Sequence, residues 1–278
     1  MSTLIVPCVG RKFANGMPQY LNRHPNGKLL IERSIEGVYI EDYQSVLIVL
    51  FEEDIKKYHA ESIILNEVKK YPIKIVSLSE MTSGPAETVY EAIKRMSITG
   101  EIVVKDADNY LKINEIPQRN FVAGLDLNIW EQDVHNLRNK SFLIVNEQGN
   151  LLDIIEKQVR SDVICLGMYG FKSAEDFVKA YEHLNDTSYP ISKLYVSHII
   201  SYLIGYAGKV FHYVSSIEYE NWGNERLWKD LQRDYALYFI DLDNILDTDG
   251  VLSDNNKKKL AILQNRGASF VGYTVENE

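Results

Sequence analysis

The chain has 278 residues, enough for one large domain or for one domain followed by a shorter unit. Hydrophobic residues make up 45% and charged residues 25%, which is an ordinary globular composition. The net charge of −9 argues against a general electrostatic attraction to nucleic acid or to an anionic membrane. A few local cations, or Mg²⁺, would still allow such a protein to hold a nucleotide.

The number of cysteines and the short apolar run at the N-terminus indicate where in the cell the protein resides. Cys8 and Cys165 lie in apolar runs, are too few for a disulfide framework, and form no C-x-x-C zinc pattern. About five apolar residues precede Pro7 and Gly10, too few for a signal-peptide core, and no run approaches the roughly 20 apolar residues of a membrane span. We therefore expect a cytoplasmic, reduced protein with neither a membrane nor a nucleic acid as partner.

Strands and helices alternate over the first hundred residues. The expected strands are residues 3–10, 45–51, 73–79 and 101–104, and the expected helices are 28–38, 53–70 and 86–96. The run 45–51 is unbroken in its apolar character, which is typical of a strand covered on both faces. The alternation predicts an α/β fold with a mostly parallel sheet covered by helices.

The pattern changes after residue 120. We expect strands at 120–128, 140–157 with a turn at Gln148-Gly149, and 163–172, then helices at 173–184 and 193–208, and a strand with a loop at 210–223. These strands predict a mixed sheet or a hairpin insertion. Ser173 and Asp176 have the spacing of a helix cap. We assign the apolar segment 194–207 to the core in preference to a dimer face, which leaves a homodimer open.

The last forty residues begin a new pattern. A strand is expected at 235–246, a helix at 255–267 and a strand at 268–274. We place a boundary near residue 235, which divides the chain into domain 1–235 and segment 236–278. The segment is shorter than the roughly 50 residues of most independent domains.

Two carboxylates follow the expected strand 101–104. Asp106 and Asp108 would face the same side if the strand continued, because side chains repeat every second residue. Two hard oxygen ligands at the carboxyl edge of a parallel sheet suit Mg²⁺ and a nucleotide phosphate. An acidic turn without a ligand fits the pattern equally well.

Two turns have features of phosphate binding. Gly10, Arg11 and Lys12 follow the first strand and would offer backbone N–H groups and cations to an anion. Gly84 and Pro85 end a tight turn directly before a helix, where the glycine would let a flat group approach and the helix N-terminus favours negative charge. An ordinary loop explains the first turn equally well, and from spacing alone a plain helix start is favoured for the second.

Three further residues are candidate ligands. Lys157 ends the segment 154–157 and would reach a phosphate, although a surface salt bridge is more common for a lone acid–lysine pair. Glu220 or Asn221 would add a second oxygen ligand. The histidines show no metal-binding spacing, and no G-x-S-x-G motif is present.

Seven stretches, in this order, resemble the sugar-phosphate and small-phosphate nucleotidyltransferases over about residues 3–235. They are LIVPCVGRKF, MPQYLNRHPNGKLLIERSIEGV, TSGPAETVYEAI, VVKDADNYL, LDIIEK, CLGMYGFKSAEDF and YENWGN. The stretches HPNGKLLIERSIEG and VKDADNYL look most like members linked to capsule and surface-polysaccharide genes.

The resemblance implies a GT-A/Rossmann-like α/β domain that binds an NTP with Mg²⁺. A phosphate oxygen of a phosphorylated small-molecule acceptor would attack the α-phosphorus and pyrophosphate would leave, with the protein positioning the groups and neutralising charge. The NTP is CTP or UTP in our expectation, and the acceptor is a sugar, polyol or amino-acid-type phosphate.

The resemblance also implies roles for individual residues. Gly10, Arg11 and Lys12 would lie on the triphosphate, and Gly84, Pro85, Ala86 and Thr88 by the base and ribose. Asp108, followed by Asn109, matches the metal aspartate of the family, Asp106 would assist it, Glu220 is a further candidate metal ligand, and Lys157 would contact the acceptor phosphate.

Three departures from the family pattern bear on activity. The glycine-rich loop is shortened to VGRKF, the usual lysine of the P-K-x-L motif is Gln19, and the usual D-W-G-T begins with Asn221. Catalysis would then be slow, rerouted through Lys12, Lys28 or Glu220, or absent. A non-catalytic nucleotide-binding relative and a GT-A glycosyltransferase, which also uses a D-x-D carboxylate pair, remain the alternatives.

The C-terminal segment resembles the start of a HAD-type phosphatase. By that likeness Asp241 would be a nucleophile and Asp243 an acid/base, while Thr274 ends the second-motif strand. The later lysine and acidic motifs of that fold are missing from the sequence. We therefore expect no phosphatase activity and interpret the segment as a remnant or a truncated form.

Overall fold

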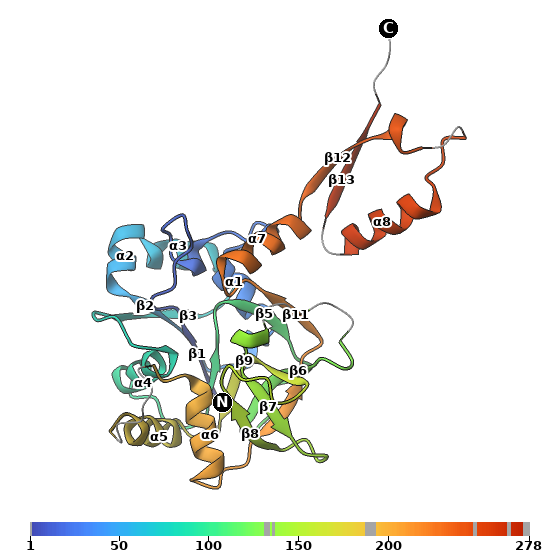
Figure 1. Cartoon of the computed structure of the whole chain (residues 1–278). Coiled ribbons are helices and arrows are strands. Elements are labelled where there is room, and N and C mark those ends of the chain that lie inside the picture. The colour runs from blue at the N-terminus through green and yellow to red at the C-terminus, as the bar shows by residue number, and fades with distance from the viewer. Residues whose placement is uncertain are drawn as a thin grey trace.

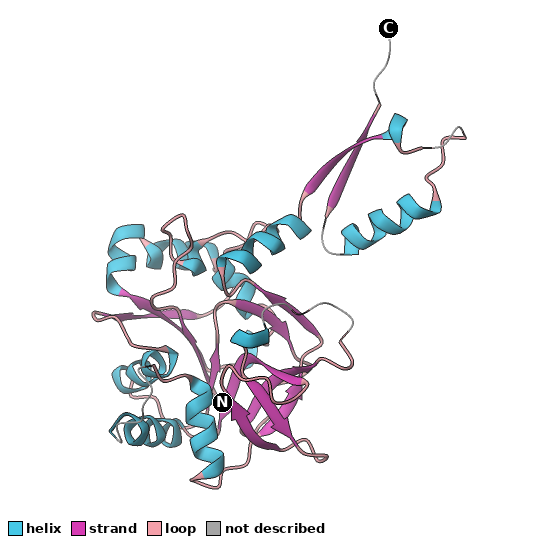
Figure 2. Ribbon diagram, viewed as in Figure 1, coloured by secondary structure: helices cyan, strands magenta, loops and turns pink. Residues whose placement is uncertain are grey.

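The computed structural model describes residues 2–130, 134, 137–186, 193–246, 249–265 and 268–274. A mixed sheet lies at the centre of the main body, with α4, α5 and α6 on one face and α1, α2 and α3 on the other (Figures 1 and 2). The strands are β1 Thr3–Pro7, β2 Ser45–Phe51, β3 Ile73–Leu78, β4 Ile102–Lys105, β5 Asn109–Lys112, β6 Phe121–Asp126, β7 Phe142–Val145, β8 Leu151–Ile155, β9 Val163–Phe171, β10 His212–Ser215, β11 Glu218–Asn221, β12 Leu237–Asp241 and β13 Ser269–Tyr273.

The helices connect these strands in the alternation that the sequence predicts. The α-helices are α1 Leu30–Ile35, α2 Glu52–Tyr58, α3 Ala60–Glu67, α4 Pro85–Arg95, α5 Ala174–Asp186, α6 Val196–Gly205, α7 Glu225–Asp234 and α8 Asp254–Asn265. Short 3₁₀ turns are Gln19–Leu21, Ile40–Asp42, Leu137–Asn139 and Leu242–Asn244. The expected α/β class with a mostly parallel sheet is confirmed.

The strand order sets the position of the functional edge. The main path of the sheet runs β10-β6-β9-β4-β1-β2-β3, and β7 and β8 extend it as a hairpin beside β9. Strand β9 is antiparallel to both of its neighbours on this path, β4 and β6, whereas β4, β1, β2 and β3 are mutually parallel. The carboxyl ends of β1 and β4 therefore meet the beginning of β9 at one edge of the sheet.

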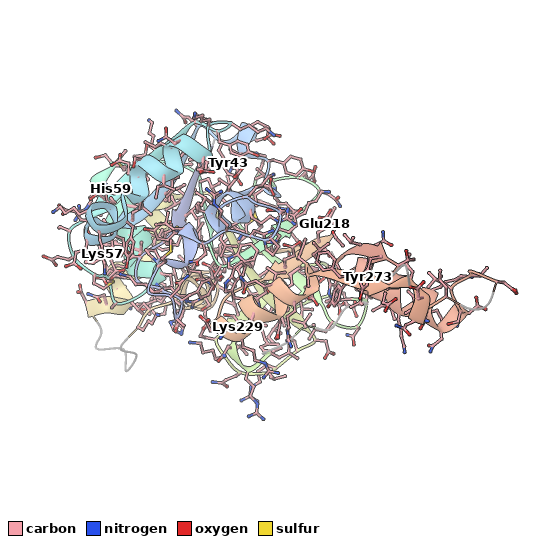
Figure 3. All side chains as sticks on the ribbon, turned by 90° about the horizontal axis from the view of Figure 1, so that it is seen from above. Tyr43, Lys57, His59, Glu218, Lys229 and Tyr273 are labelled. Atoms are coloured by element: carbon pink, nitrogen blue, oxygen red, sulfur yellow. The ribbon has the colours of Figure 1, made fainter. Side chains whose placement is uncertain are left out.

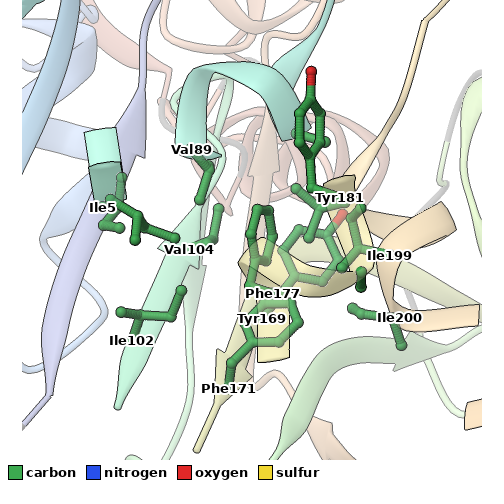
Figure 4. Close-up of a cluster of buried hydrophobic side chains, with 14 of the residues drawn as sticks. Ile5, Val89, Ile102, Val104, Tyr169, Phe171, Phe177, Tyr181, Ile199 and Ile200 are labelled. Atoms are coloured by element: carbon green, nitrogen blue, oxygen red, sulfur yellow. The ribbon is translucent and has the colours of Figure 1, made fainter. Parts of the chain in front are cut away.

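Both faces of the sheet are covered, as the unbroken apolar strands predict. In β1 the side chain of Ile5 enters one hydrophobic cluster, while Leu4 and Val6 enter the other, and all three are fully buried. Figure 4 shows the first cluster, in which Val89 of α4 and Ile199 of α6 pack toward the sheet residues. Two separate layers of helices thus hold the sheet rigid beneath its carboxyl edge.

The central region contains the expected hairpin and cap. Strands β7 and β8 pair antiparallel, and Ser173 Oγ accepts a 3.2 Å hydrogen bond from the backbone N–H of Asp176. The segment 194–207 belongs mainly to the core, because Ile199 and Ile200 are fully buried, although Tyr206 at its end is 76% exposed. Residues 210–223 form two strands, of which β10 extends the main sheet and β11 pairs with β5.

One expected helix is divided in two, and one further helix was not expected. The single helix expected over 53–70 is divided into α2 and α3 at His59, whose backbone is left-handed with φ of 54°. Helix α7 was not expected, although Asn224 caps it by accepting a 3.0 Å hydrogen bond from Leu227 N. Its apolar spacing at Leu227, Trp228 and Leu231 is short and interrupted by charges, so periodicity alone is a weak signal there.

The two strands of the C-terminal segment pair with each other and belong to a sheet separate from the central one (Figure 1). Strands β12 and β13 are parallel, α8 connects them, and the unit projects from the main body beyond α7. The division of the chain near residue 235 and the HAD-like character of 236–278 stay predictions. Among the helices of the described residues, none has the length and apolar character needed to cross a bilayer.

The break at His59 yields a stability prediction. Replacing His59 by Gly removes a left-handed strain of about 1 kcal/mol but increases the entropy of the unfolded chain, so we expect a net gain of about 0.5 kcal/mol in the free energy of unfolding. Lys57, exposed on neighbouring α2 (Figure 3), is the matched control: Lys57→Gly should cost about 1 kcal/mol. Urea denaturation of both variants checks this, and equal destabilisation by the two would contradict it.

Candidate functional site

Two adjoining cavities open at the carboxyl edge of β1 and β4. The first has a volume of about 510 Å³ and extends toward β8, β9 and α7, and the second, of about 460 Å³, extends toward the Gly84-Pro85 turn before α4. The residues that line both cavities are Arg11, Pro85, Asp106, Asp108 and Tyr195. The two aspartates singled out in the sequence therefore lie where the cavities meet.

The aspartates reach this junction through a turn. Strand β4 ends at Lys105 and residues 107–108 form a turn, so the condition that would place Asp106 and Asp108 on one side of a continuing strand is not met. Asp106 N donates a 2.7 Å hydrogen bond to Gly167 O of β9. A Cβ on Gly167 would lie 2.3 Å from Asp106 Oδ2, and its φ of +76° also favours glycine. Gly167 thus makes room for the Asp106 carboxylate.

Lys105 stabilises the turn at residues 106–109 and was not singled out in the sequence. Its side chain is fully buried, and Nζ donates to Asp106 O at 2.5 Å, to Asn109 O at 3.0 Å and to Asn109 Oδ1 at 2.9 Å. All three donors of the ammonium group are satisfied. Burial lowers the pKa of Lys105 to about 8, against the opposing effect of Asp106 and Asp108.

The environments of the two carboxylates differ. Burial, and then the negative charge of Asp108, raise the pKa of Asp106 to about 7. Burial also acts to raise the pKa of Asp108, but Arg11, Lys140 and Lys105 outweigh it and hold that pKa below its usual value. Asp108 is therefore the fixed anion of the site, and its carboxylate forms an ion pair with Arg11.

Segment 221–224 supplies a neutral oxygen beside Asp108. A Cβ on Gly223 would lie 3.0 Å from both Asp108 Oδ2 and Asn221 Oδ1, so these two oxygens converge on one point. Among the described residues no group of three or more His, Cys, Asp or Glu side chains gathers as a metal site. Two carboxylates with an amide oxygen still suit Mg²⁺, which is commonly held by one or two carboxylates together with substrate phosphates.

Glu220, the other candidate ligand, lies outside both cavities. It forms an ion pair with Arg33 at 2.7 Å, lies 3.2 Å from His24 Nε2, and accepts a 3.0 Å hydrogen bond from Tyr235 OH. Neighbouring residues of a strand face opposite sides, so Asn221 faces the site and Glu220 does not. The structure thus corrects the expectation that Glu220 is a metal ligand.

The loop after β1 contributes backbone and cations. Gly10 lines the second cavity with φ of +96°, and Arg11 also donates a 2.7 Å hydrogen bond to Gly223 O. Lys12 lines the first cavity and forms a 2.7 Å ion pair with buried Asp54. The hydrogen bond and charge of Asp54 outweigh burial and raise the pKa of Lys12.

The turn before α4 lines the second cavity. Gly84, Pro85 and Thr88 lie on its wall, whereas Ala86 is fully buried and does not line either cavity. The need for glycine at position 84 is explained by the chain itself, since a Cβ there would lie 2.6 Å from Leu194 O. Asn109 is buried at the first cavity and donates a 3.2 Å hydrogen bond to Asp108 Oδ1.

Two residues linked to the departures from the family pattern have structural partners. Gln19 is 5% exposed, borders the second cavity and donates a 2.5 Å hydrogen bond to Trp222 O. Lys28 forms an ion pair with Glu36 and lines neither cavity. Rerouting of catalysis through Lys28 or Glu220 is therefore not supported by their positions, whereas Lys12 borders the first cavity.

The far wall of the first cavity carries two lysines. Lys157 Nζ donates a 2.5 Å hydrogen bond to Tyr195 OH and lies 3.7 Å from Glu156 Oε1. Lys140, which sequence reasoning did not single out, is partly buried and donates to Tyr219 OH. Burial acts to lower the pKa of Lys140, but Tyr219 and Asp108 outweigh it and raise that pKa. A lysine before a strand is too common in sequences to be a signal by itself.

Comparison with known proteins gives the fold. A nucleoside-diphosphate-sugar pyrophosphorylase from Vibrio cholerae RC9 matches with a TM-score of 0.66 and 19% identity, covering 82% of this chain and 98% of that one. An inositol-1-phosphate CTP transferase from T. maritima matches with a TM-score of 0.63 and 12% identity, covering 82% and 91%. A UDP-glucose pyrophosphorylase in complex with UDP-glucose gives 0.61 and 13%, covering 83% and 96%.

No family model matches the sequence, and no curated protein does. At 12–19% identity the structural likenesses establish the fold and leave the activity open. The structural neighbours are nucleotidyltransferases, so the chain shares the mixed α/β fold of that class.

Glu220 and its partners Arg33 and His24 give a prediction about how the free energy of unfolding depends on pH. Burial acts to raise the pKa of Glu220, but hydrogen bonds from His24 and Arg33 outweigh it and lower that pKa to about 2. Because the folded-state pKa is depressed, the stabilisation is complete above about pH 4.5 and is lost as pH falls toward 2, a loss of about 3 kcal/mol.

We therefore expect Glu220→Gln to be less stable than the wild type at pH 7 and to lose less of its free energy of unfolding between pH 5 and pH 3. Denaturant titrations at each pH measure this difference. Parallel pH profiles for the two proteins would show that Glu220 has an ordinary pKa and that the ion pair contributes nothing.

Proposed function

We propose that this chain is a Mg²⁺-dependent cytoplasmic nucleotidyltransferase. It would transfer an NMP unit from an NTP to a phosphorylated small molecule, a sugar, polyol or amino-acid-type phosphate, with release of pyrophosphate. The observation that carries this proposal is the position of Asp106 and Asp108 at the junction of two cavities. A reaction between two substrates needs two subsites that meet at the reacting atoms.

The second cavity suits the nucleotide. Its wall combines the Gly84-Pro85 turn with Gly10, so a base and ribose would lie against backbone, with the hydroxyls of Thr82 and Thr88 hydrogen-bonded to each other at 2.7 Å. The triphosphate would extend toward Arg11 and the aspartates, where the two cavities join. The first cavity would then receive the acceptor.

The reaction requires positioning and charge neutralisation. A phosphate oxygen of the acceptor would form a bond to the α-phosphorus, the bond from that phosphorus to the bridging oxygen would break, and pyrophosphate would leave with the electron pair. Asp106, Asp108 and Asn221 Oδ1 would hold Mg²⁺, which when bound neutralises charge that develops on the phosphates. Arg11 would orient the triphosphate through the guanidinium donors that are not bonded to Asp108 and Gly223 O.

We further propose which nucleotide the enzyme uses and which pathway it serves. Transfer of CMP or UMP is favoured, since two neighbours are described as a CTP transferase and as a UDP-glucose pyrophosphorylase. The resemblance of residues 24–37 and 104–111 to capsule-linked members supports a role in surface-polysaccharide biosynthesis. We also propose 236–278 as a separate HAD-like unit without phosphatase activity.

A pyrophosphate-release assay tests the proposal. Each of the four NTPs would be incubated with Mg²⁺ and with sugar 1-phosphates, inositol 1-phosphate, polyol phosphates, phosphocholine and phosphoserine. Release with one NTP and one acceptor supports the transferase and identifies both substrates. NTP binding without pyrophosphate release in the presence of any acceptor favours the non-catalytic relative, and hydrolysis of an NDP-sugar or transfer from it favours the glycosyltransferase.

Asp108→Asn gives the sharpest prediction for a variant. It keeps the shape but removes the carboxylate, so we expect pyrophosphate release to fall by about 10³-fold or more, because the site loses its fixed anion. Asp241→Asn is the control, since Asp241 lies on β12 outside both cavities and should leave the rate unchanged. An active Asp108→Asn variant would end the metal role assigned to Asp108.

A further inference from the structure

The cations on the wall of the first cavity differ in their partners. Arg11 pairs with Asp108, Lys12 pairs with Asp54, and Lys157 lies 3.7 Å from Glu156. Among the part of the chain that the structure describes, Lys140 has no carboxylate within 4.0 Å of Nζ. It is thus the lysine of this wall whose charge is not neutralised by such a contact.

The backbone holds Lys140 firmly in place. Lys140 O accepts a 3.1 Å hydrogen bond from Lys157 N, and the next residue, Ser141, accepts a 2.8 Å bond from Cys165 N of β9. Its side chain lies against Tyr219, with Nζ 5.2 Å from the ring centre and bonded to the phenol oxygen. Tyr219 on β11 therefore holds the ammonium group of Lys140 in position.

The contacts of Lys140 leave donors for a ligand. An ammonium group has three donors, and Tyr219 OH accepts one of them. A partly buried cation without an ion partner loses hydration that an anion can replace, which makes its position a site for anion binding. Lys140 lines the same cavity as Asp106 and Asp108, so an anion bound to it would share that cavity with the two carboxylates.

We propose that Lys140, and not Lys157, binds the phosphate group of the acceptor. The inference rests on the proposed function, because that reaction brings an acceptor phosphate to the aspartates. Lys157 is engaged instead with Tyr195, whose ring centre lies 4.1 Å from Nζ, and would border the remainder of the acceptor. Lys140 thereby supplies a cation to the phosphates in a site where Gln19 stands in place of the usual lysine.

The substrate class follows from this position. The phosphate monoester end of the acceptor would bind Lys140 as a dianion and would face Asp106 and Asp108. The uncharged end would lie toward Tyr195 and Glu156, where buried Ser197 Oγ donates a 2.6 Å hydrogen bond to Glu156 Oε2 and holds that carboxylate. The acceptor is therefore a phosphate monoester with a small polar, hydroxyl-bearing remainder.

The test compares three variants of the full chain. Lys140→Met removes the charge, Lys140→Arg keeps it, and Lys157→Met is the matched control from the same wall. We expect Lys140→Met to raise the acceptor KM about tenfold or more, with the NTP KM changed less than about twofold, and Lys140→Arg to recover most of the loss. Thermal unfolding of each variant verifies that the fold is intact.

Calorimetric titration with inorganic phosphate in the presence of Mg²⁺ gives a readout that does not need turnover. Phosphate affinity that falls about tenfold in Lys140→Met and less in Lys157→Met supports the inference even if no acceptor leads to pyrophosphate release from an NTP. Pyrophosphate release with an unchanged acceptor KM in Lys140→Met overturns it and leaves the transferase proposal standing. Equal or greater loss in Lys157→Met, or no phosphate binding by the wild type, also overturns it.

Discussion

The buried ammonium group of Lys105 is the interaction on which the candidate site depends. Its three hydrogen bonds to Asp106 and Asn109 fold the chain sharply at the end of β4. A buried charge with all donors satisfied tolerates little movement, because breaking one bond leaves an unpaired donor away from water. The turn therefore presents Asp106 and Asp108 to the cavities although the strand has ended, and β5 begins at once with Asn109.

A second set of contacts connects the loop after β1 to segment 221–228. Phe13 stacks on Trp228 with ring centres 5.6 Å apart, Ala14 N donates to Glu225 Oε2 at 3.0 Å, and Gln19 donates to Trp222 O. Together with the bond of Arg11 to Gly223 O, these contacts bring two segments some 200 residues apart against one another. Gln19 therefore has a structural role in this arrangement, in which its amide binds a buried carbonyl and supplies no cation.

The sequence predicted the parts of the fold that rest on hydrophobic pattern. The strands of 3–10, 45–51 and 101–104, and the hairpin of 140–157, appear where apolar runs and a Gln-Gly turn indicate them. The position of Glu220 depends on a long-range ion pair with Arg33, and the break at His59 depends on a left-handed backbone. Neither feature produces a periodic pattern in the sequence. Lys140 was beyond sequence reasoning for the same reason, since its importance arises from β9 and Tyr219 placed beside it by the fold.

The charge balance of the first cavity connects the proposed metal to the acidic chain. Its wall contains the cations Arg11, Lys12, Lys140 and Lys157 and the carboxylates Asp106, Asp108, Glu156 and Glu225. Three of these four cations already have a carboxylate within 4.0 Å, so the wall cannot by itself neutralise the charges of a triphosphate and a phosphate monoester held close together. A divalent cation between the aspartates and the phosphates would supply the missing positive charge and would let a protein of net charge −9 bind two anionic substrates.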